Sequence, residues 1–132
     1  MKARRLSCPA VRQIEVIEFD LPAVPDDGIL VQNEHTLVSV GTELYGYMHG
    51  AEPGQERKFP RGTGYCSAGI VLEVGSAVTD VKPGDRVAGQ GNHASHSILR
   101  GGGTTYQKVP TDLSSRSAVF MVMGAIAIHG TR

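Results

Sequence analysis

The sequence predicts a mainly β domain, built as a barrel or sandwich of short strands. The chain has 132 residues, which is enough for one domain with a modest core. Its 17 glycines and 7 prolines imply many turns. The apolar residues come in short β-rich runs, such as residues 70–74, that end at turn residues. Together these three observations favour many short strands over a helical bundle.

The strands are expected in order along the chain. They are predicted over residues 13–19, 29–40, 64–74, 85–88 and 105–109, with a short helix or turn over 41–50. In the second strand, Ile29, Val31 and Leu37 share one face, which is typical of a half-buried strand. His35 lies on the same face and interrupts its apolar pattern.

One turn is predicted from its chemistry. In Lys82-Pro83-Gly84-Asp85, proline presets φ for the first corner and glycine tolerates a positive φ at the next. Arg86 then restarts a strand.

A helix is predicted over residues 114–129. Ser114 or Ser115 can cap it by accepting a hydrogen bond from a first-turn amide. From Ala118 to Ile128 the sequence is apolar on almost every side, so the helix needs burial all round. It is either the core of a small domain or a connection to a second domain.

Composition excludes several classes of partner. The 13 basic and 13 acidic residues cancel, so nothing favours a nucleic-acid or anionic membrane surface. No apolar run approaches the roughly 20 residues that a membrane-spanning helix needs. Cys8 and Cys66 make no disulfide framework, and we expect a reduced cytoplasmic protein.

The segment at residues 64–87, GYCSAGIVLEVGSAVTDVKPGDRV, combines these strand and turn signals in a long, mixed pattern. It resembles the GroES-like N-terminal domain of medium-chain dehydrogenases/reductases, the zinc alcohol dehydrogenase superfamily. The resemblance implies a GroES-like β-barrel over residues 1–113. It also implies that residues 114–132 form a helix leading into a Rossmann domain, with NAD or NADP bound beyond Arg132.

The family's zinc ligands have no counterparts here. Residues 40–43, Val-Gly-Thr-Glu, match its Cys-Gly-x-Asp element, and Val40 has no lone pair to donate. Tyr65 and Cys66 stand at the histidine and glutamate of its Gly-His-Glu element, and the third ligand position aligns with Met123. No cysteine follows Cys66, so the structural zinc lobe is absent as well. The resemblance therefore implies a zinc-lacking branch, similar to the quinone-reductase-like members.

Without zinc, hydrogen bonds must stabilise charge on the substrate oxygen. Thr42 keeps a hydroxyl that many relatives place in a proton relay, and Tyr45 stands where many have a relay histidine. The phenol of Tyr65 is expected to point into the former metal site and donate to a carbonyl oxygen. The alternative for each tyrosine is packing against the barrel wall with its hydroxyl in water. The residues expected to form the substrate pocket are Val40, Cys66, His93 and Met123.

Three further predictions concern residues near this site. His93 and His96 chelate a metal only if residues 92–97 form a turn; otherwise they are ordinary loop histidines, and we expect no metal. Glu43 is expected to orient local backbone rather than act as a base. Cys66 is expected to be a quiet, buried thiol.

No nucleotide site is expected within the chain. The glycines at 89–91 and 101–103 lack both the G-x-G-x-x-G spacing and a strand-to-helix context, so they are predicted to be turns. The resemblance therefore implies the substrate-side domain of an NAD(P)-dependent oxidoreductase acting on an alcohol or carbonyl. As a fragment it is expected to be inactive, and the parent is expected to be a homo-oligomer. The alternative is a non-catalytic binding or structural module.

Overall fold

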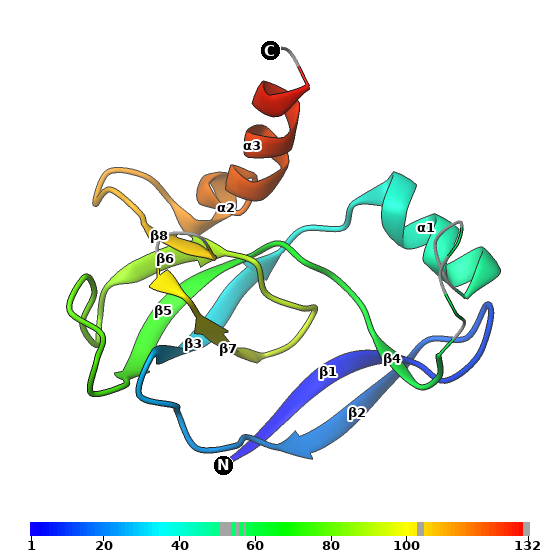
Figure 1. Cartoon of the computed structure of the whole chain (residues 1–132), viewed down its shortest axis with the longest axis horizontal. Helices are drawn as coiled ribbons and strands as arrows, with labels where there is room; N and C mark the ends of the chain where they lie inside the picture. Colours follow the sequence, from blue (N-terminus) through cyan, green and yellow to red (C-terminus); the bar gives the residue numbers. More distant parts are fainter. Residues whose placement is uncertain (51–53, 55, 57, 103–104, 131–132) are drawn as a thin grey trace.

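The structure, a computed structural model, describes all residues except 51–53, 55, 57, 103–104 and 131–132. Two antiparallel sheets make up the domain (Figure 1). The smaller has the order β2 (Glu15–Asp20), β1 (Lys2–Cys8) and β4 (Arg61–Gly62). The larger has the order β7 (His96–Arg100), β3 (Gly28–Thr36), β5 (Ser67–Val74), β6 (Arg86–Gly89) and β8 (Tyr106–Lys108). The predicted mainly β class is confirmed.

Two apolar clusters hold the larger sheet together. The first lies between its strands and turns and is formed by Ile29, Val31, Val71, Val81, Val87, Leu99 and Tyr106. The second lies under the C-terminal helices and is formed by Cys66, Ala68, Ala88, Val109, Ala118 and Val119. Strands β5 and β6 contribute residues to both clusters, and the pairing of β3 with β5 shifts register twice, so that the sheet curls.

Helix α1 (Val40–His49) lies beside the smaller sheet and forms the wall of the site described below (Figure 1). It ends at Gly50, which has a φ of 83° and donates its backbone N–H to the carbonyl of Gly46. Glycine at this position is the usual left-handed helix terminus. The helix or turn predicted over residues 41–50 is thereby confirmed as a helix.

Some predicted boundaries are wrong. The strand expected over residues 29–40 ends at Thr36, because Val40 already begins α1. Strands β1 and β7 were not predicted. Strand β1 buries Ala3, Ser7 and Cys8, and the short β7 buries Ser97 and Leu99, so neither offers a long apolar alternation.

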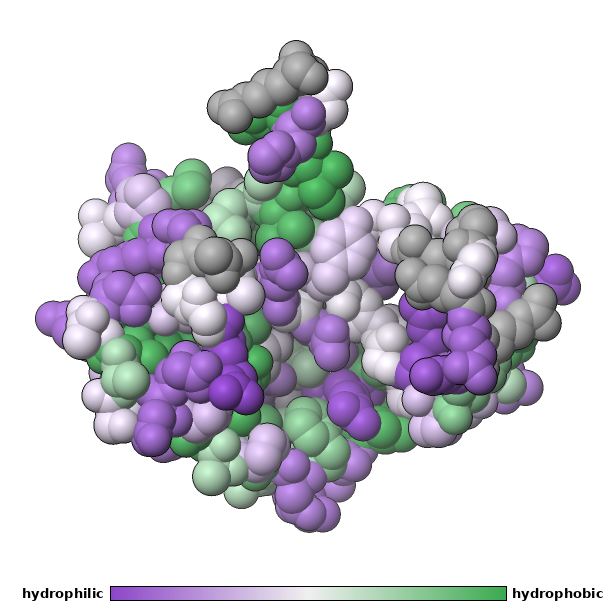
Figure 2. All heavy atoms as spheres, viewed as in Figure 1, coloured by the Kyte–Doolittle hydropathy of each residue, from purple (hydrophilic) through white to green (hydrophobic). Residues whose placement is uncertain are grey.

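The single helix expected over residues 114–129 is divided into α2 (Ser115–Ala118) and α3 (Met121–His129). The Ser114 side chain accepts from the backbone N–H of Ser117, which confirms the predicted cap. Helix α3 contains no buried residue, and Figure 2 shows it standing away from the body of the molecule with hydrophobic residues on its surface. The domain division at residue 114 stays a prediction. No helix among the described residues is long and apolar enough to cross a membrane.

Because α3 is exposed in this chain, replacing Ile126 with serine should change the free energy of unfolding by less than about 0.5 kcal/mol. The side chain of Ile126 is 54% exposed. Urea unfolding monitored by circular dichroism checks this. A loss of about 2 kcal/mol or more would show that the Ile126 side chain packs against this domain.

Candidate active site

A cleft of about 450 Å³ opens between α1 and the smaller sheet; we call it the α1 cleft. Its walls are mainly apolar, formed by Leu6, Cys8, Ile14, Val38, Val40 and Leu44. Its polar lining residues are Thr42, Glu43, Tyr47, Arg61, Thr63, Tyr65 and His93. An apolar hollow with a few convergent polar groups is the usual form of a small-molecule site.

A buried chain of hydrogen bonds crosses the wall of the α1 cleft. The Nε2 atom of His93 lies 2.8 Å from Oε2 of Glu43, and its Nδ1 lies 2.8 Å from Oγ1 of Thr36. The side chains of His93 and Glu43 are only 6% and 15% exposed. The second oxygen of Glu43, Oε1, accepts from the backbone N–H of Ser39 at 2.8 Å. Glu43 therefore fixes the start of α1 and the imidazole ring at once.

Gly64 lets the chain pass directly against His93. It has a φ of +86°, and a Cβ built there would lie 2.7 Å from the backbone nitrogen of His93 and 2.8 Å from its ring. The same backbone nitrogen donates to the carbonyl of Thr63 at 2.8 Å. The segment before β5 therefore holds His93 in place from one side while Glu43 holds it from the other.

Tyr65 forms a second polar group in the cleft. Its hydroxyl donates to Oγ of Ser39 at 2.6 Å and also lies 3.4 Å from the sulfur of Met123. The phenol hydroxyl is thus held by two partners rather than left in water. The Tyr65 hydroxyl therefore contacts both Ser39, just before α1, and Met123 of helix α3.

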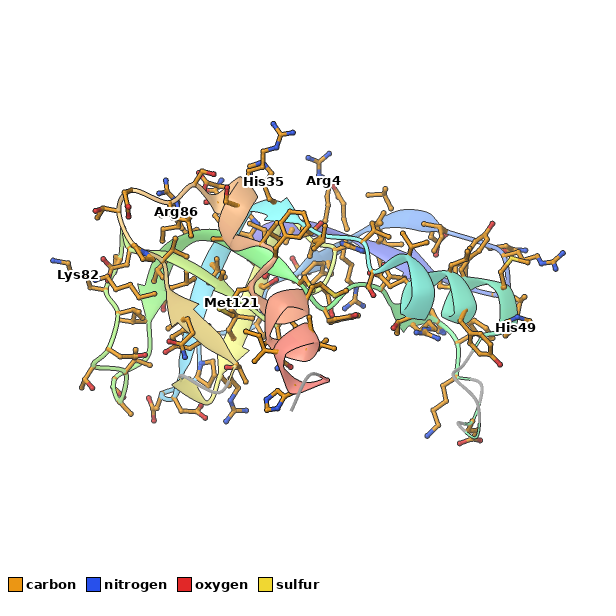
Figure 3. All side chains as sticks on the ribbon, turned by 90° about the horizontal axis from the view of Figure 1, so that it is seen from above. Arg4, His35, His49, Lys82, Arg86 and Met121 are labelled. Atoms are coloured by element: carbon orange, nitrogen blue, oxygen red, sulfur yellow. The ribbon has the colours of Figure 1, made fainter. Side chains whose placement is uncertain are left out.

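The structure gathers several of the predicted site residues and separates others. Val40, Thr42, Tyr65 and His93 all line the α1 cleft, whereas Tyr45 does not. The Tyr45 ring packs against His49 with the ring centroids 4.5 Å apart. His49 marks the end of α1, well away from Met121 on α3 (Figure 3).

Cys66 and Met123 lie outside the cleft lining, although both are close to it. Cys66 is fully buried in the cluster under the C-terminal helices. Burial, and secondarily the nearby charge of Glu43, raise the pKa of its thiol. The predicted quiet thiol fits this environment, because a raised pKa keeps sulfur protonated. Met123 reaches the site only through its contact with the Tyr65 hydroxyl.

The residues at the family's metal positions do not fit zinc. Val40 offers no donor atom, and Tyr65 offers a hydroxyl already bonded to a serine. Among the described residues, no group of three histidine, cysteine, aspartate or glutamate side chains could hold a metal ion. Each ring nitrogen of His93 lies 2.8 Å from a protein oxygen, and Nδ1 of His96 lies 3.0 Å from the hydroxyl of Ser95.

Sequence reasoning missed the pairing of Glu43 with His93 and the part played by Thr36 and Ser39. It expected Glu43 to orient local backbone, which the bond from Ser39 confirms. It had no signal for the partner of the second carboxylate oxygen, because His93 lies fifty positions further along the chain.

The model of the alcohol dehydrogenase GroES-like domain matches residues 26–120. S-(hydroxymethyl)glutathione dehydrogenase of Photobacterium damsela subsp. piscicida is 40% identical over 74 residues, which are 56% of this chain and 19% of that enzyme. An Escherichia coli oxidoreductase/dehydrogenase of unknown specificity superposes with a TM-score of 0.84 at 19% identity, covering 98% of this chain and 46% of its own.

Two further solved structures share the fold. The 2R,3R-butanediol dehydrogenase of Bacillus subtilis has a TM-score of 0.82 at 18% identity, covering 98% of this chain and 47% of its own. Escherichia coli quinone oxidoreductase, solved with NADPH, has a TM-score of 0.70 at 25% identity, and the match covers 88% of this chain and 36% of that enzyme. The chain thus spans less than half the length of these relatives. It belongs to the alcohol dehydrogenase GroES-like domain family of medium-chain dehydrogenases/reductases.

Proposed function

We propose that this chain is the substrate-side domain of an NAD(P)-dependent oxidoreductase that interconverts an alcohol and a carbonyl without zinc. The supporting observation is the α1 cleft, in which Tyr65, Thr42 and the Glu43–His93 pair meet in a chain of this family. The nicotinamide, bound by a Rossmann domain after residue 132, would supply or accept the hydride.

The residues of this chain would bind the substrate oxygen and handle its proton. The hydroxyl of Tyr65 is positioned by its hydrogen bond to Ser39. When a substrate is bound, this hydroxyl can donate to the substrate oxygen in place of the serine. Thr42 adds a second hydroxyl from the first turn of α1. The Glu43–His93 pair offers a buried place for a proton beside these donors.

The walls of the cleft indicate the substrate class. Most of the accessible surface that lines the cleft is apolar, and the charge of Glu43 is already engaged by His93 and Ser39. The guanidinium of Arg61 donates to the carbonyl of Gly50 at 3.0 Å and covers Gly46. An uncharged carbonyl compound with an apolar substituent fits this lining better than an anionic peptide does.

The isolated chain is proposed to be inactive, because the nicotinamide site lies in the other domain. A non-catalytic module is the remaining alternative. The residues at the family's zinc-ligand positions, Val40, Tyr65 and Met123, favour this alternative. In a protein that no longer catalyses a reaction, these positions would be free to change.

Replacing Tyr65 with phenylalanine in the full-length gene product should lower kcat/KM for an apolar aldehyde with NADH or NADPH by about a hundred-fold. That is the usual size of a lost oxyanion donor. Tyr45→Phe is the matched control, because Tyr45 lies outside the cleft; it should stay within two-fold of wild type. Absence of turnover by the wild-type protein with either nicotinamide and a broad carbonyl panel would favour the non-catalytic module.

A further inference from the structure

We propose that Glu43, His93 and Thr36 form a proton path from the α1 cleft to a second hollow on the other side of the cleft wall. This inference rests on the proposed function, because it assigns the route taken by the proton of that reaction. We call the second space the β1 hollow. Its volume is about 430 Å³, and its lining includes Arg4, Arg5, Thr36, His93 and Ser95.

His93 belongs to both spaces. It lines the α1 cleft and the β1 hollow, whereas Glu43 lines only the first and Thr36 only the second. Glu43 meets one ring nitrogen at 2.8 Å and Thr36 meets the other at 2.8 Å. Donor and acceptor atoms therefore stand at hydrogen-bond distance from one side of the wall to the other.

The partners of the imidazole suit either of its protonation states. When the ring is neutral, Nε2–H donates to the Glu43 carboxylate and Nδ1 accepts from the Thr36 hydroxyl. When the ring is charged, Nδ1–H donates and the hydroxyl turns to accept. Hydroxyl rotation thus keeps His93 bonded on both sides. In carbonyl reduction Nδ1 takes up a proton through the Thr36 hydroxyl, Nε2–H passes its proton to the Glu43 carboxylate, and Glu43 gives that proton to the substrate oxygen; alcohol oxidation runs the same transfers in reverse.

The proposed reaction needs such a route. Alcohol oxidation transfers a hydride to the nicotinamide and leaves one proton from the hydroxyl; carbonyl reduction takes one proton up. A second domain docked over the cleft would restrict water there.

The β1 hollow lies on the other side of this wall, and Arg4 at its edge points away from the ribbon (Figure 3). Arg4 and Arg5 are the charged groups lining that hollow, with Arg5 packed over Phe19 at 5.0 Å.

Thr36→Val removes the last member of the path without touching the α1 cleft, and Thr36→Ser keeps the hydroxyl as the matched control. In the full-length protein with a nicotinamide and an apolar carbonyl, Thr36→Val should lower kcat about ten-fold, with KM unchanged and a larger solvent deuterium isotope effect. Thr36→Ser should remain close to wild type. Equal kcat and isotope effect for wild type and Thr36→Val would overturn the path while leaving the proposed function intact.

A second measurement does not depend on activity. In the 132-residue chain labelled with 15N-histidine, exchange of the His93 Nδ1 proton with water is measured by NMR at a pH where both ring nitrogens are protonated. Thr36→Val should slow this exchange at least about five-fold relative to Thr36→Ser and wild type, since the Thr36 hydroxyl is the hydrogen-bond partner through which the Nδ1 proton would leave. Unchanged exchange would contradict the path. If Thr36→Val does not fold, Thr36→Ala takes its place, with the same expected result.

Discussion

Replacing Gly64 with alanine is expected to cost about 3 kcal/mol or more of unfolding free energy. Two effects combine at this position. The backbone has a φ of +86°, which disfavours any L side chain, and the new Cβ would lie 2.7 Å from the backbone nitrogen of His93. That nitrogen is bound to the carbonyl of Thr63, so the contact cannot be relieved without breaking a hydrogen bond beside the site.

Gly84→Ala is the matched control for this substitution. Gly84 has a similar φ of +91°, but nothing lies within 4 Å of the position its Cβ would take. Only the conformational cost remains there, about 1–2 kcal/mol. Urea unfolding of the two variants separates the effects. Equal losses for Gly64→Ala and Gly84→Ala would show that the close approach to His93 contributes nothing.

Glu43→Ala is expected to lower the free energy of unfolding by about 2–4 kcal/mol, because it leaves two buried donors unpaired. These are the backbone N–H of Ser39 at the start of α1 and Nε2–H of His93, each now 2.8 Å from a Glu43 oxygen. The carboxylate is 15% exposed, so water replaces it poorly. Calorimetric or urea unfolding measures the loss.

Glu43→Gln tests the same account with the shape retained. The amide oxygen can still accept from Ser39, and the amide N–H₂ can donate to Nε2 of His93. The ring then carries its proton on Nδ1 and donates it to Thr36. Stability should therefore stay within about 1 kcal/mol of wild type. If Glu43→Ala is as stable as Glu43→Gln, the two hydrogen bonds do not matter for the fold.

Features set by local chemistry were predictable from the sequence. The turn at residues 82–85 forms as expected: Gly84 has a positive φ, and the backbone N–H of Asp85 donates to the carbonyl of Lys82 at 3.0 Å. The Ser114 cap is of the same kind, since it needs only a serine before a helical run. The resemblance carried by residues 64–87 also indicated the right fold. The turns and strands of this segment follow from its local sequence and do not depend on a metal.

Features set by contacts far apart in sequence were not predictable. Strand β1 buries Ala3, Ser7 and Cys8, so its burial gave no apolar signal. The Glu43–His93 pair joins a helix to a loop fifty positions later, and no local pattern indicates such a contact. Of the residues that the resemblance suggested, Thr42 and Tyr65 line the α1 cleft, whereas the ring of Tyr45 packs against His49. The catalytic roles of these residues stay proposals.

The most direct test of the central proposal, a zinc-free reaction at the α1 cleft, is turnover of the full-length protein after exhaustive dialysis against a chelator, with zinc measured in the same sample. The account predicts unchanged kcat/KM with an apolar carbonyl and NAD(P)H at less than about one zinc per ten chains, and loss of turnover in Tyr65→Phe. Activity that disappears with the metal and returns on adding zinc would contradict it.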